Sequence, residues 1–207
     1  MKSNKAIKKD KERKAGDRFI KLHNEEGGYN FAFKEQPEED PPDLIYEDLR
    51  ASKTLLLEIT AAYYNQDDAK WVWDIKRGID TRKISPSPLI QAPDSSSYNF
   101  LNNLIQKKCR VLLQGKKKEH FCCADPIFLV IDLEELLLTT SANVQEFIDS
   151  YLVLPHDVPF QEIWLLLEEP VGRSLSPGEN VLDIPLTEAL QLQSRRFRLY
   201  PGHSDHL

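Results

Sequence analysis

The stretch PPDLIYEDLRASKTLLLEIT, residues 41–60, carries two acidic side chains within runs of apolar residues. Asp43 stands at the head of DLIYED, and Glu58 follows three leucines in KTLLLEITAAYY. Both runs predict strands, and LRAS between them predicts a turn. In an antiparallel hairpin the start of one strand lies opposite the end of the other, so we expect Asp43 and Glu58 to lie close together.

Two neighbouring acids in a protein core need a chemical reason. A buried carboxylate must be paired, hydrogen-bonded, bound to a metal or protonated, because a lone charge is costly in an apolar interior. Mg²⁺ prefers oxygen ligands and is often held by one or two carboxylates together with waters and substrate phosphates. Asp43 and Glu58 therefore predict a site for Mg²⁺ or Mn²⁺. The alternative is that Glu58 marks the solvent-facing end of its strand and that Asp43 is a turn residue after Pro42.

The segments around this hairpin predict an α/β fold. We expect a helix within residues 11–26, a strand at 29–33, a helix at 98–113, a strand within 125–136, a helix at 141–152, a strand at 160–170 and an edge strand at 194–201. Arg196 and Arg198 are expected to face outward from that edge strand. Short links join the first three strands, as in antiparallel neighbours, and helices join the later ones, as in parallel crossovers. The prediction is a mixed central sheet flanked by helices.

The length of 207 residues suits one domain, which we place at residues 15–207. Residues 1–14 are expected to be a basic N-terminal arm or the start of a helix. An irregular segment at about 65–97, rich in proline and serine in its second half, is expected to be an insertion in the domain.

Charge is distributed unevenly along the chain. Residues 1–21 hold nine basic and three acidic side chains, a net charge of +6, which leaves −12 for the rest because the total is −6. A basic segment on an acidic body is able to bind phosphates, although a solvated helix start explains it equally well. Lys8 and Lys9, together with Lys116, Lys117 and Lys118, are the candidate contacts to a nucleic-acid backbone.

Cysteine usage and hydropathy bear on the compartment. Three cysteines, two of them adjacent, do not make a disulfide framework. The basic N-terminus lacks the apolar region of a signal peptide, and no apolar run approaches the roughly 20 residues that span a bilayer. We therefore expect an intracellular, cytoplasmic protein with no membrane partner.

The hairpin resembles a known motif. Pro42-Asp43, followed fifteen positions later by Glu58-Ile59-Thr60, is similar to the motif of the PD-(D/E)XK nuclease superfamily, the restriction-endonuclease-like fold. The α-β-β-β-α-β order from about 10 to 132 is similar to the core of that family. The resemblance covers about two-thirds of the chain in the order of elements but only a handful of residues in the motif.

The resemblance implies a magnesium-dependent phosphodiesterase acting on nucleic acid, most simply an endonuclease acting on DNA. Asp43 and Glu58 would hold the metal, which would activate a water and stabilise charge on the phosphoryl oxygens. The family's catalytic lysine stands two residues after the second acid, where this chain has Thr60. Thr60 would then be a cleft residue that hydrogen-bonds a water or a ligand.

Lys108 is the candidate replacement for the missing lysine. Leu101, Leu104, Ile105 and Leu112 define one apolar face of the helix at 98–113, and position 108 belongs to the same face. A cation on a buried stripe invites a carboxylate partner, which favours Lys108 over Lys107. The alternative is a lysine whose ammonium extends to the edge of the helix and into solvent.

An acid from the first helix often completes such sites in the family, and Glu12, Asp17 and Glu25 remain open candidates here. The alternative function is a catalytically inactive protein of the same fold that binds a protein or a nucleic acid. A homodimer is a further possibility by analogy with small domains of this fold. Substrate type, DNA or RNA, is not fixed by the sequence.

Overall fold

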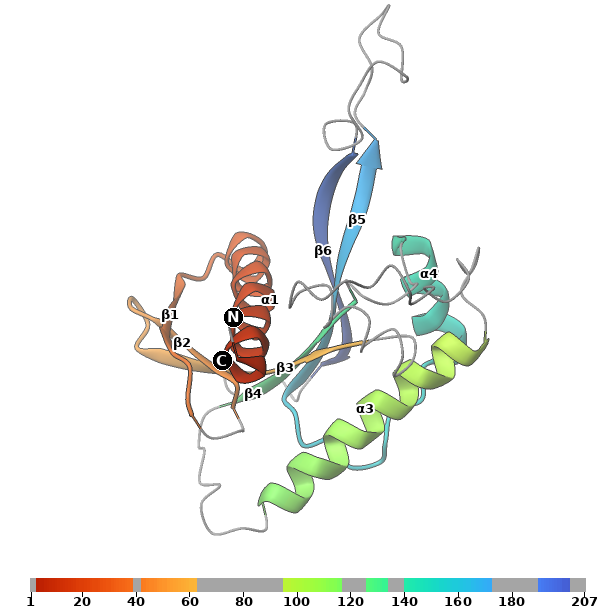
Figure 1. Ribbon diagram of the computed structural model, residues 1–207, viewed down its shortest axis with the longest axis horizontal. Helices are drawn as coiled ribbons and strands as arrows, with labels where there is room; N and C mark the ends of the chain where they lie inside the picture. Colours follow the sequence, from red (N-terminus) through yellow and green to blue (C-terminus); the bar gives the residue numbers. More distant parts are fainter. Residues whose placement is uncertain are drawn as a thin grey trace, which may run out of the picture.

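Six strands form one mixed sheet in the part of the chain that the structure describes, and helices cover it (Figure 1). A computed structural model describes residues 3–38, 42–62, 95–116, 126–133, 140–172 and 190–201. Its elements in chain order are α1 (Asn4–Gly27), β1 (Phe31–Glu35), β2 (Leu44–Asp48), β3 (Lys53–Ala61), α3 (Ser95–Lys116), β4 (Ile127–Asp132), α4 (Ser141–Glu146), the π-helix η1 (Phe147–Tyr151), β5 (Glu162–Gly172) and β6 (Leu190–Pro201). The α/β class and the predicted order of elements are confirmed.

The strands lie in the sheet in their sequence order, β1 to β6. Strands β1, β2 and β3 are antiparallel neighbours, β3, β4 and β5 are parallel, and β6 is antiparallel to β5. As predicted, the short links join antiparallel neighbours, and the links that contain helices join parallel strands. Strand β3 lies between β2 and β4, and β6 lies at an edge, as predicted.

Each face of the sheet has its own apolar core. On one face, Phe19 and Ile20 of α1 belong to a cluster with Leu55, Leu57 and Ile59 of β3. On the other face, the buried stripe of α3 packs with Leu56 of β3 and with alternate residues of β4 and β5. Because side chains alternate along a strand, Glu58 and Thr60 lie on the same face as Leu56, the face covered by α3.

Helix α1 approaches β2 closely at Gly16. A Cβ atom at this position would lie 2.3 Å from Leu44 Cδ1 and 2.8 Å from the Tyr46 hydroxyl. Both side chains are almost fully buried and have little room to move. The absence of a side chain at Gly16 thus sets the distance between α1 and β2, and it fixes the position of Glu12 one turn earlier on the same helix face.

The prediction that Arg196 faces outward is wrong. Its side chain is only 6% exposed, and its guanidinium lies 4.3 Å from the ring centroid of Trp164 on the neighbouring strand. Its Nε donates to Glu26 Oε2 at 2.9 Å. Arg198 is 43% exposed and forms an ion pair with Glu162. The apolar stem and flat guanidinium of Arg196 cover aromatic surface between α1 and the sheet, which the sequence pattern of an edge strand does not reveal.

Candidate functional site

The hairpin of β2 and β3 positions the two predicted acids. Leu44 pairs with Leu57 in the antiparallel register, so Asp43, one residue before β2, lies opposite Glu58. The backbone N–H of Asp43 donates to the Leu57 carbonyl at 3.0 Å. The backbone N–H of Ile59 donates to Asp43 Oδ2 at 2.8 Å. These two bonds anchor the Asp43 carboxyl against β3.

The turn that closes this hairpin depends on Asp48. Its Oδ1 accepts hydrogen bonds from the backbone N–H of Arg50 at 2.8 Å and of Ala51 at 3.3 Å, which satisfies donors that the ladder leaves unpaired. Ser52 adopts a φ of 51°, in the left-handed region. The turn predicted at LRAS is therefore present, and its side-chain hydrogen bonds help to fix the register that brings Asp43 to Glu58.

Asp43 is a buried acid with a strongly raised pKa. Only 3% of the residue is exposed. Burial, followed by the charges of Glu58 and Glu12, raises the pKa of Asp43 from 3.8 to about 8, against the opposing effects of the Ile59 N–H and the Lys108 charge. This environment therefore favours the protonated form of Asp43 in the metal-free protein.

Lys108 of α3 lies beside Glu58 on the face of the sheet that α3 covers. Its Nζ lies 2.8 Å from Glu58 Oε1, and the two side chains are 25% and 12% exposed. The lysine stands on the buried stripe of α3 with Leu101, Ile105 and Leu112. The stripe therefore directs one cation to Glu58, while Lys107 is exposed on the neighbouring position.

The second oxygen of Glu58 bears on whether a metal fits. Oε2 is buried and has no hydrogen-bond donor among the described residues. A small cation that prefers oxygen would satisfy this atom and would also relieve the repulsion between Glu58 and an ionised Asp43. Two carboxylates are the whole set here, since no group of three or more His, Cys, Asp or Glu side chains in the described residues is arranged to hold a metal ion. Waters and substrate oxygens would have to supply the remaining ligands.

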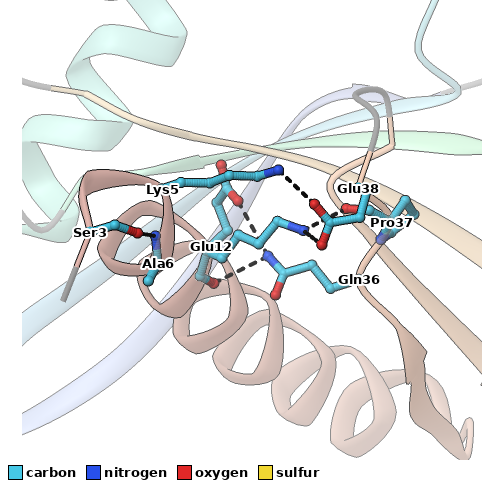
Figure 2. Close-up of polar contacts among 8 residues, drawn as sticks. Ser3, Lys5, Ala6, Glu12, Gln36, Pro37 and Glu38 are labelled. Atoms are coloured by element: carbon cyan, nitrogen blue, oxygen red, sulfur yellow. Dashed lines mark hydrogen bonds and ion pairs between the residues drawn. The ribbon is translucent and has the colours of Figure 1, made fainter.

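Of the three acids considered on the first helix, only Glu12 is directed to this region. It is 7% exposed, and its charge contributes to the raised pKa of Asp43. Lys8 Nζ lies 3.1 Å from Glu12 Oε1. Gln36 Nε2 donates to Glu12 Oε2 at 3.3 Å (Figure 2). Asp17 instead accepts a hydrogen bond from the Tyr46 hydroxyl at 2.8 Å.

Glu25, the third acid considered, is exposed. Gln36 was not among the predicted residues. It follows β1 and donates both to the Lys9 carbonyl, at 3.2 Å, and to Glu12. A single polar residue in a loop gives no sequence signal for such a role, because only the packing of α1 beside this loop creates it.

The remaining predicted residues have different positions. Thr60 is half-buried on the face that α3 covers. Lys8 is paired with Glu12, and Lys9 Nζ lies 2.9 Å from Glu38 Oε1. Lys116 is the last residue of α3, and nothing is described of its side chain. Lys117 and Lys118 lie outside the described residues, as does the predicted insertion except for its last three residues, which begin α3.

The N-terminal segment is helical in this structure. Helix α1 begins at Asn4, and the hydroxyl of Ser3 accepts from the backbone N–H of Ala6 at 3.2 Å as an N-cap. Of the two expectations for residues 1–14, the start of a helix thus describes the segment from Asn4 onward.

Comparisons with protein-family models, with curated proteins and with solved structures found no match. The described residues form an α/β fold with a six-stranded mixed sheet, in which Lys108 of α3 lies beside the facing pair of Asp43 and Glu58. In the described part of the chain, no helix is both long and apolar enough to cross a membrane.

Proposed function

We propose that this chain is a metal-dependent nuclease of restriction-endonuclease-like fold, which hydrolyses phosphodiester bonds in nucleic acid, with DNA as the first substrate to test. One observation carries the proposal: Lys108 Nζ lies 2.8 Å from Glu58 Oε1, and Glu58 lies across the hairpin from Asp43. Three side chains from three parts of the chain thus form the acid–acid–lysine set that such an enzyme needs. The α-β-β-β-α-β order of the elements supports the same proposal.

In this proposal Asp43 and Glu58 hold Mg²⁺ or Mn²⁺. The bound ion supplies a Lewis acid for the phosphoryl oxygens and lowers the pKa of a coordinated water. Asp43 must first release its proton, because only the ionised carboxyl is a good ligand. Its pKa of about 8 means that metal binding is expected to release a proton near neutral pH and to strengthen as the pH rises.

Lys108 and Thr60 act beside this pair in the proposal. The Lys108 ammonium keeps positive charge next to Glu58 and is able to donate to a phosphate oxygen that enters the site. Thr60, two residues after Glu58 on the same face of β3, offers a hydroxyl to a water or to the substrate. Catalysis would then use a lysine from α3 in the place of a lysine on the strand.

Cleavage of DNA tests this function directly. The purified protein is expected to cut single- or double-stranded DNA with Mg²⁺ or Mn²⁺ and to lose the activity in a chelator. Replacing Glu58 by Gln is expected to reduce the rate about a hundredfold, as loss of a group that acts on charge in the transition state typically does. The control is Glu47→Gln, which removes a partly exposed carboxylate from β2. Equal rates for the two variants would contradict the assignment of Glu58.

A catalytically inactive protein of the same fold, which binds a protein or a nucleic acid, is the second candidate. The net charge of −12 outside residues 1–21 favours it, because an acidic body repels a nucleic-acid backbone. Thr60 at the position of the family's lysine favours it as well.

Metal-dependent stability separates the two candidates. A nuclease is expected to gain about 2.7 kcal/mol of unfolding free energy when Mg²⁺ is present at a hundred times its dissociation constant. A thermal-shift titration measures the gain, and the Glu58→Gln variant is expected to lose most of it. An unchanged melting temperature with Mg²⁺ and with Mn²⁺, together with no cleavage of DNA or RNA, would favour the inactive protein.

A further inference from the structure

Three lysines lie on the same face of α1 as Glu12. Counted from Lys5, the spacings are three residues to Lys8, four to Lys9 and seven to Glu12. The four residues therefore share one face of the helix. Lys8 pairs with Glu12 at 3.1 Å. Lys5 and Lys9 instead converge on a carboxylate that comes from the segment after β1 (Figure 2).

That carboxylate belongs to Glu38, and each of its oxygens receives one ammonium. Lys5 Nζ lies 2.6 Å from Oε2, and Lys9 Nζ lies 2.9 Å from Oε1. The two lysines lower the pKa of Glu38 to about 2, so the group is ionised at every physiological pH. An anion with two oxygens is thus held between two ammonium groups, as a phosphate group would be.

Glu38 is not required to hold its segment on the helix. Lys9 Nζ also donates to the Pro37 carbonyl at 3.0 Å, and Gln36 Nε2 donates to the Lys9 carbonyl at 3.2 Å. These bonds attach residues 36 and 37 to α1 without the carboxylate. The side chain of Glu38 is 76% exposed, and ion pairs this exposed contribute little to stability.

We propose that Lys5 and Lys9 form a subsite for a backbone phosphate of the nucleic-acid substrate and that Glu38 occupies this subsite in the unliganded protein. The proposal rests on the nuclease function. Two ammonium groups that face the two oxygens of one carboxylate are also able to hold two oxygens of a phosphate. The exposed carboxylate then swings into water and is replaced. Gln36 bonds both Lys9 and Glu12, so the subsite adjoins the acidic centre through one residue.

Binding without metal tests the subsite apart from catalysis. The probe is a fluorescein-labelled oligodeoxythymidylate in a chelator, with affinity measured by anisotropy between about 50 and 200 mM salt. Glu38→Gln is expected to bind the probe about twofold to fivefold more tightly, which is the range that release of a weak surface ion pair allows. Lys5→Gln and Lys9→Gln are each expected to weaken binding and to reduce the salt slope by about 0.7.

The matched control is Glu47→Gln, which removes the same charge from an acid that pairs with Lys34 at 3.6 Å elsewhere on the surface. A second comparison adds Glu38→Gln to the Lys5→Gln/Lys9→Gln double variant, where it is expected to change nothing. The proposal is overturned if Glu38→Gln binds no better than Glu47→Gln, or if its gain persists without the two lysines. Tighter binding by Glu38→Gln with no cleavage of DNA or RNA by the wild-type protein supports the subsite while contradicting the nuclease function.

Discussion

Replacing Asp43 by asparagine is expected to raise the free energy of unfolding of the metal-free protein by on the order of 3 kcal/mol near pH 8. The reason is the environment of the carboxyl: it is 3% exposed, lies opposite Glu58 and feels the charge of Glu12. An amide of similar shape removes the cost of burying a charge, and its oxygen is still able to accept from the N–H of Ile59. Chemical denaturation with and without chelator measures the change.

The effect is expected to depend on pH in a defined direction. The pKa of Asp43 is about 8 in the folded state and near the ordinary value of 3.8 in the unfolded chain. Between these values the folded state keeps a proton that the unfolded chain has released, so the Asp43 contribution to unfolding free energy falls as pH rises from about 4 to about 8. The stability difference between the asparagine variant and wild type should widen over this window and level off above it.

The titration of His23 changes the free energy of unfolding with pH in the opposite direction. Its contribution must therefore be separated from that of Asp43. Burial, followed by the charges of Arg196 and Arg198, lowers the pKa of His23 from 6.5 to about 4, so stability from this group rises with pH across that interval. Both proteins contain His23, and subtracting one pH profile from the other cancels its contribution. Asp10→Asn, at an exposed position, is the control and should show little change. A less stable Asp43→Asn protein at pH 8 would mean that the Ile59 bond to the carboxylate outweighs its burial.

Replacing Lys108 by methionine is expected to destabilise the protein by roughly 2 to 4 kcal/mol at neutral pH. Glu58 is 12% exposed and would lose the only cation that the described residues place within hydrogen-bonding distance of it. The charge of Lys108 also opposes the rise in the Asp43 pKa. Methionine keeps the apolar stem on the stripe of α3, so the loss reports charge and hydrogen bonding rather than volume. DNA cleavage is expected to disappear in the same variant if the nuclease proposal holds.

A double-mutant cycle shows whether the pair itself is responsible. Combining Lys108→Met with Glu58→Gln should recover most of the stability, because no uncompensated charge remains. Lys107→Met is the matched control on the exposed neighbouring position and should change the unfolding free energy by less than about 0.5 kcal/mol. Similar losses for Lys107→Met and Lys108→Met, or no coupling in the cycle, would rule out the ion pair as the cause.

The pairing of the two acids could be predicted because it depends on local pattern. Proline before Asp43, the apolar runs on both sides and a short turn define a hairpin whose register follows from strand alternation. The direction of Lys108 depends on helical periodicity alone, which places it with Leu101, Ile105 and Leu112. Each of these inferences concerns residues within one element or two adjacent ones.

The choice among the acids of the first helix was beyond such reasoning. Glu12, Asp17 and Glu25 all stand on one helix, and periodicity does not tell which side of it meets the strands. The close approach at Gly16 decides this, because it fixes where α1 touches β2 and turns Glu12 toward Asp43. Arg196 was misplaced for the same reason: its partners Trp164 and Glu26 belong to distant segments.

The sequence by itself thus determined the α/β class, the order of the helices and strands along the chain, and the pairing of Asp43 with Glu58 across the hairpin. Tertiary structure decided the electrostatic state of that pair. The burial of Asp43, the nearby charge of Glu12 and the contact from Lys108 arise only when α1 and α3 pack on opposite faces of the sheet. Burial and distance set the cost of a charge, and both are properties of the assembled fold rather than of any one segment.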